Sequence, residues 1–243
     1  RWSTGKSNCN HRRIGKMDIM LREELSKIYS AVPEGDCSGC GRCCHESVGA
    51  SFAEAELIYQ DIKAMPAEKR KQIIDRILDY YFDVYQIRRK CPFLSPENRC
   101  EIYASRPLNC RIYGHWSRQE YENNLDRLKC SNDKISQVLI EKYGYKVKQD
   151  YLDFSIGFCN DFRGRLLSRD ERNELYDSLI VLDSKMFVRL GLRLAYEDKG
   201  IVEHIVDRLL SKEKIFEIKM RGELSPGMMN RLKNIAVLRI GAV

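Results

Sequence analysis

The sequence has no run of the roughly 18 to 20 uncharged apolar residues that a membrane-spanning helix needs. Its best candidate, Leu179 to Leu182, is interrupted by Asp183 and Lys185. The opening residues are basic, but they lack the apolar region and the small-residue cleavage site of a secretory signal. We therefore expect a cytoplasmic protein with no membrane partner.

A dense stripe of charge of one sign is also missing. The chain has 42 Lys and Arg against 35 Asp and Glu, a formal net charge of +7. Nucleic-acid binding favours clustered basic residues with interleaved aromatics, so we expect no specific nucleic-acid partner. No Gly-x-Gly-x-x-Gly run follows a predicted strand, and the residues Thr4 to Ser7 lack the first glycine of a phosphate-binding loop. The sequence therefore shows no motif of a nucleotide-binding fold.

Apolar residues recur at helical spacing along most of the chain, and capping-box patterns begin at Ser51, Ser117 and Ser168. The fold class that we predict is mainly α, a helical bundle with irregular cysteine-rich loops and little or no sheet. A short strand or turn is expected near Arg99 to Tyr103. The expected helices cover residues 17–29, 51–63, 66–89, 118–128, 131–142, 168–195, 201–211 and 226–239.

The cysteines suggest three parts of the chain. Residues 1–36 would form an N-terminal leader with a short helix, and residues 37–130 a metal-binding region with a helical insertion at 51–90. Residues 131–243 would form a helical C-terminal region. No linker rich in Gly, Ser or Pro separates this region, so it can belong to the same domain.

Ten cysteines are the unusual feature of the composition. A disulfide framework is typical of short secreted chains that cannot build a core. A chain of this length in a reducing compartment more often groups its thiols around metal.

The sharpest motif is Cys37-x2-Cys40-x2-Cys43-Cys44. Gly39 and Gly41 allow the left-handed backbone that a tight turn around a metal requires. The spacing resembles that of bacterial ferredoxins, which favours iron–sulfur over zinc. Adjacent side chains in extended backbone point to opposite sides, so Cys44 suggests a second site nearby.

Further along the chain, Cys91-Pro92 resembles the Cys-Pro that closes the ferredoxin run. Eight thiolates suit two four-iron clusters or, as the alternative, two tetrahedral zinc sites. Cys9 and Cys159 are left over, and Cys159 is the substitute to examine first if one site is completed differently. The eight predicted metal ligands are Cys37, Cys40, Cys43, Cys44, Cys91, Cys100, Cys110 and Cys130.

Arginines accompany the cysteines. Arg42, Arg106 and Arg111 are predicted to donate hydrogen bonds to the sulfur ligands or to carbonyls around the cofactor. His45 follows Cys44, but beside a complete thiol set we expect it outside the ligand shell.

Four separately spaced blocks follow in order: Cys37-x2-Cys40-x2-Cys43-Cys44, Cys91-Pro92-Phe93-Leu94, Cys100-Glu101-Ile102-Tyr103 and Arg106-Pro107-x2-Cys110-Arg111-x-Tyr113. Together they resemble the YkgJ-type cysteine-cluster family named for its CxxCxxCC motif. The resemblance covers roughly residues 37 to 130 and implies a zinc- or iron-chelating domain. Because the family includes flagellin lysine N-methylases, it also implies methyl transfer to protein lysines, with S-adenosylmethionine as a cofactor.

Two functions follow from these patterns. The first is an iron–sulfur protein with two 4Fe–4S clusters that supports electron transfer or a protein modification such as lysine N-methylation, with a redox partner or a protein substrate. The second is a scaffold, not an enzyme, that zinc or iron stabilises and that docks a partner protein. The sequence presents no evident catalytic acid, base or nucleophile, so whether the chain is a methyltransferase-like enzyme stays open.

Overall fold

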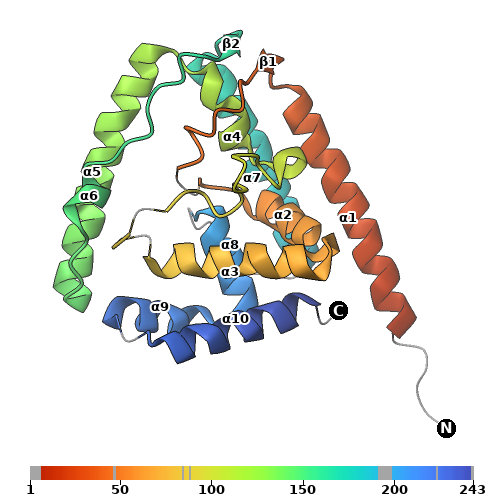
Figure 1. The fold of residues 1–243 in the computed structure, drawn as a ribbon. Coiled ribbons are helices and arrows are strands. Elements are labelled where there is room, and N and C mark those ends of the chain that lie inside the picture. Colours follow the sequence, from red (N-terminus) through yellow and green to blue (C-terminus); the bar gives the residue numbers. More distant parts are fainter. Residues whose placement is uncertain are drawn as a thin grey trace.

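A computed structural model describes residues 7–45, 48–83, 85–87, 89–190, 199–222 and 224–241, with the side chains of the first helix from Ile19 onward. The described part is mainly helical, and its one sheet has two short strands, as predicted (Figure 1). Within this part, no helix has the length and apolarity needed to cross a membrane. The elements follow in the order α1 (Ser7–Ser30), β1 (Gly35–Asp36), α2 (Phe52–Ala64), α3 (Ala67–Asp83), η1 (Tyr103–Ser105), α4 (Leu108–Ile112), η2 (Tyr113–His115), α5 (Arg118–Tyr143), α6 (Gln149–Leu152), β2 (Arg163–Gly164), α7 (Arg169–Leu190), α8 (Ile201–Leu209), α9 (Lys212–Arg221) and α10 (Pro226–Gly241).

Local capping chemistry sets several helix starts. Ser51 accepts a hydrogen bond from the Glu54 amide, and the Glu54 carboxylate accepts one from the Ser51 amide, which is the predicted capping box of α2. Ser168 and Glu171 make the same reciprocal pair before α7. At α5 the Ser117 hydroxyl accepts from the Glu120 amide and donates to the Glu120 carboxylate. All three predicted starts are confirmed.

Other helix boundaries differ from the predictions. The first helix begins at Ser7, ten residues before its predicted start, and α3 ends at Asp83, not at Arg89. Two predicted helices merge into α5, because no glycine or proline separates them. The helix α9 was not predicted; it ends at Gly222, whose φ of 65° is the left-handed cap typical of helix ends.

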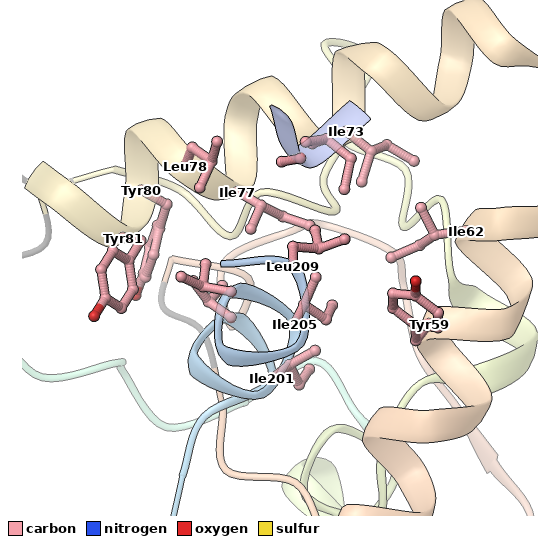
Figure 2. Close-up of a cluster of buried hydrophobic side chains, with 14 of the residues drawn as sticks. Tyr59, Ile62, Ile73, Ile77, Leu78, Tyr80, Tyr81, Ile201, Ile205 and Leu209 are labelled. Carbon is pink, nitrogen blue, oxygen red and sulfur yellow. The ribbon is translucent and has the colours of Figure 1, made fainter. Parts of the chain in front are cut away.

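Two large hydrophobic clusters hold the helices together. The first lies between α2, α3, α8, α9 and α10, and Figure 2 shows side chains such as Ile77 and Ile205 pointing toward one another within it. The second joins α1, α2, α4 and α7 through residues such as Leu25, Leu57 and Leu179. Because α2 contributes to both clusters, it fixes one relative to the other. The predicted division into three parts is not tested by this packing and stays a prediction.

The strands β1 and β2 pair antiparallel, with Gly35 opposite Gly164 and Asp36 opposite Arg163. At Arg99 to Tyr103, where a short strand or turn was expected, the structure has an isolated bridge between Leu94 and Cys100, followed by a turn and the 3₁₀ helix η1. In Figure 1 the cysteine loops after β1 and after α3 cross the middle of the view, between α1 and α5.

Candidate metal centre

The first cysteine loop follows β1 and is shaped by its glycines. Gly39 and Gly41 have φ angles of +65° and +69°, which confirms the predicted left-handed backbone. The Cys44 amide then donates to the Gly41 carbonyl at 3.0 Å and closes a turn. Cys37 and Cys40 are exposed on this loop, whereas Cys43 and Cys44 are half-buried.

A backbone hydrogen bond joins the first loop to the second. The Cys91 amide donates to the Cys44 carbonyl at 3.0 Å. The second loop then turns back on itself, because Glu101 N donates to the carbonyl of the buried Phe93 at 2.8 Å and Leu94 bridges Cys100. This hairpin brings Cys91 and Cys100, which are nine positions apart, into one neighbourhood.

The short helix α4 carries Cys110 and is fixed by a buried carboxylate. Glu54, only 1% exposed, accepts hydrogen bonds from the Leu108 amide at 2.6 Å and from the Tyr29 hydroxyl at 3.0 Å. Asn109 donates to the Gly49 carbonyl at 2.7 Å. Residues of α1, α2 and the first loop therefore position the Cys110 segment. The capping pattern pointed to Glu54, but nothing in the sequence indicated its bond to α4.

Charge interactions connect the thiols of five cysteines. Burial, followed by the charges of Cys91, Cys100 and Cys43, raises the pKa of the Cys110 thiol. Burial raises the pKa of Cys91 to about 12, and the charges of Cys100 and Cys43 add to the shift. The pKa of Cys44 is raised by its hydrogen bond with Cys43, by burial and by charges that include those of Cys91 and Cys110. We call this set, Cys43, Cys44, Cys91, Cys100 and Cys110, the inner thiol group.

Most thiols of the inner thiol group lose their protons less readily than an ordinary cysteine when no cation is bound. Its members other than Cys43 have raised pKa values, and only Cys43, which is hydrogen-bonded to Cys44, has a pKa lowered to about 6. A metal ion offsets the repulsion among thiolates and releases their protons on binding. Metal affinity at such a group therefore rises with pH.

The three predicted arginines have different surroundings. Arg42 Nε donates to Cys40 Sγ at 3.3 Å, and its Nη2 pairs with Asp161. Arg106 Nε is buried with no hydrogen-bond partner, while its charge lowers the pKa values of Cys43, Cys100 and Cys110. Arg111 instead donates to the carbonyls of Arg106 and Ala104 and lies over the Tyr29 ring.

These surroundings fit a thiolate-bound metal. The donors are thiols, two loops are hydrogen-bonded together, and Arg106 Nε offers a buried donor with no acceptor in the protein. Among the described residues, no three cysteine, histidine or carboxylate side chains have the arrangement of a ready-made metal site. The thiols are thus gathered, but binding requires their side chains to move together.

The remaining candidates lie farther from the inner thiol group. Cys130 is exposed within α5 and is not a member of the inner thiol group. Cys159 is half-buried, and burial, followed by the charges of Cys43, Cys40 and Cys37, raises its pKa. The His45 ring lies 6.5 Å from the Phe154 ring. The side chain of Cys9 and the residues Thr4 to Lys6 lie outside the described part.

Comparison with known families agrees with the motif. Residues 36–131 match the family CxxCxxCC, described as a putative zinc- or iron-chelating domain. No curated protein and no solved structure matches the chain. The matched segment includes the eight predicted ligands and ends before Cys159. Over residues 36–131 the chain is therefore similar to the CxxCxxCC family, whose domain is described as a putative zinc- or iron-chelating one.

Proposed function

We propose that the chain is an iron–sulfur protein that holds two 4Fe–4S clusters at adjacent thiolate sites. The observation that carries this proposal is the inner thiol group, with Cys37 and Cys40 on the same loop as two of its members. A single tetrahedral zinc ion takes four ligands, so five interacting thiols already exceed one zinc site. The ferredoxin-like spacing of the first loop favours iron.

The clusters would support electron transfer or a modification of proteins such as lysine N-methylation. A pocket of about 620 Å³ supports the second reaction, because Arg106 and Arg111 line it together with His115 and Phe162. Its size lies within the range typical of small-molecule sites. The guanidinium groups can pair with a carboxylate such as that of S-adenosylmethionine, although Glu34 and Asp36 also line the pocket. The charge of Arg106 also acts on Cys100 of the inner thiol group.

Metal analysis tests this function directly. The protein is purified without oxygen, reconstituted with iron and sulfide, and analysed for iron, sulfide and zinc with a visible spectrum. If the chain holds two 4Fe–4S clusters, the analysis should find about eight irons and eight sulfides per chain. Cys110→Ser, which removes a thiol of the inner group, should lower the iron content. A wild-type protein without iron and sulfide would refute the proposal.

The second candidate is a metal-stabilised scaffold that docks a partner protein. Exposed aliphatic side chains on α7 favour it, since Ile180, Val181 and Val188 are 45%, 53% and 75% exposed. With zinc as the stabilising metal, this candidate predicts about two zinc ions per chain without sulfide. The same analysis therefore separates a zinc-stabilised scaffold from the iron–sulfur protein.

A further inference from the structure

We propose that Cys159, which lies beyond the matched family domain, binds metal together with Cys37, Cys40 and Cys43. Cys44, Cys91, Cys100 and Cys110 then form the second set of four, and Cys130 is not a ligand. This inference rests on the proposed metal function. It changes the predicted ligand set at one position, because the loop between α6 and β2 is joined to the first cysteine loop.

Strand pairing brings the two loops together. Asp36 of β1 lies opposite Arg163 of β2 in an antiparallel pair. Cys37 follows Asp36 directly, and Cys159 precedes Arg163 by four residues. In antiparallel strands, the chain that leaves one strand runs beside the chain that enters the other. The pairing therefore brings the segment of Cys159 to the beginning of the cysteine loop.

An arginine makes a second connection between the loops. Arg42 donates from Nε to Cys40 Sγ at 3.3 Å and pairs through Nη2 with Asp161. Asp161 is two residues from Cys159. One guanidinium group thus contacts a thiol of the first cysteine loop and a carboxylate of the loop between α6 and β2, because its several N–H donors can serve two acceptors at once.

Aromatic side chains fix the loop on both sides of Cys159. On one side, the Tyr113 hydroxyl donates to the Gly157 carbonyl at 2.8 Å. On the other side, the Phe162 ring packs against Gly35 and Gly114, where any side chain would overlap it, and lies 4.6 Å from the His115 ring. The backbone around Cys159 is therefore held in place without metal.

The surroundings of Cys159 and Cys130 differ. Cys159 is half-buried on a loop that strand pairing and the Arg42–Asp161 ion pair hold beside the first cysteine loop. Cys130 is exposed on α5. With Cys159 in place of Cys130, the eight ligands divide into two sets of four, and the neighbours Cys43 and Cys44 belong to different sets.

Metal content of Cys159→Ala and Cys130→Ala tests the assignment. After anaerobic reconstitution, Cys159→Ala should retain about half of the wild-type iron, one cluster of two. Cys130→Ala, the matched control, should retain all of it. Full iron in Cys159→Ala, or a loss of iron in Cys130→Ala, would overturn the inference and leave the proposed function standing. A wild-type protein without metal would overturn both.

Alkylation of the wild-type protein gives a second measurement, independent of whether the variants fold. The metal-loaded full chain is treated with iodoacetamide, and modified peptides are quantified by mass spectrometry before and after chelation. The peptide of Cys159 should be protected until the metal is removed, and that of Cys130 should react in both states. Equal labelling of Cys159 with and without metal would also overturn the inference.

Discussion

Lys219 is a buried cation whose removal should stabilise the protein. Its side chain is 6% exposed, and its Nζ lies 4.3 Å and 4.4 Å from the ring centroids of Tyr81 and Tyr85. Burial lowers the pKa of Lys219 from 10.5 to about 8, and the charge of Glu203 offsets only part of this shift. At 1.36 kcal/mol per pKa unit, the charged form costs on the order of 3 kcal/mol.

Lys219→Met keeps the length of the side chain and removes the charge. The variant loses two cation–π contacts that stabilise by roughly 0.5 to 2 kcal/mol in total, so we expect a net gain of about 1 to 3 kcal/mol in the free energy of unfolding at pH 7. Urea denaturation measures this gain. Lys214→Met, an exposed change on the same helix, should alter stability by less than about 0.5 kcal/mol.

The pH dependence gives the sharper test. Between the folded pKa of about 8 and the unfolded value of 10.5, the unfolded state holds the proton that the folded state has released. The free energy of unfolding of the wild-type protein therefore increases as pH rises through this window. The difference in free energy of unfolding between Lys219→Met and the wild type shrinks by about 2 kcal/mol from pH 8 to pH 10. Comparing the two proteins at each pH cancels the titration of the other groups. A difference that stays constant from pH 7 to pH 10 would contradict the reasoning.

Two further substitutions test how the loops are positioned. Glu54→Gln should lower the free energy of unfolding by about 1.5 to 3 kcal/mol, because an amide cannot accept all the hydrogen bonds from Ser51, Tyr29 and Leu108; unchanged stability in urea denaturation would count against this role. Gly114→Ala should destabilise by about 1 to 3 kcal/mol, since its methyl group overlaps the Phe162 ring. Thermal melting measures this loss, and Gly157→Ala, which meets open space, is the control that should melt like wild type.

Features that depend on local hydrogen bonds or on one periodic face could be predicted from sequence. Ser51 and Ser168 marked helix starts, because a capping box involves residues only three positions apart. The spacing of Ile73 and Ile77 predicted the buried face of α3. The end of α3 could not be predicted, since Tyr85 leaves the helix to pack against Tyr145 and Tyr151, which are distant in sequence.

The same division applies to the metal centre. The spacing of Cys37, Cys40 and Cys43 is a local pattern, and it identified the first loop and the family. The proposed replacement of Cys130 by Cys159 rests on a sheet with two residues in each strand, which is too short to leave a periodic signal. Neither Asp161 nor Phe162 carries a recognisable motif, and only the folded chain brings them to Arg42 and Gly35.

The buried members of the two large hydrophobic clusters include no cysteine, although Cys91 and Cys100 touch the rim of the first. Among the described helices, α2 joins these clusters without any bond through sulfur. We therefore expect the polypeptide to complete its helical frame first and to bind metal afterwards. The thiol side chains would then move together on a frame that is already folded, and a molecule that has lost its metal could be refilled instead of being degraded.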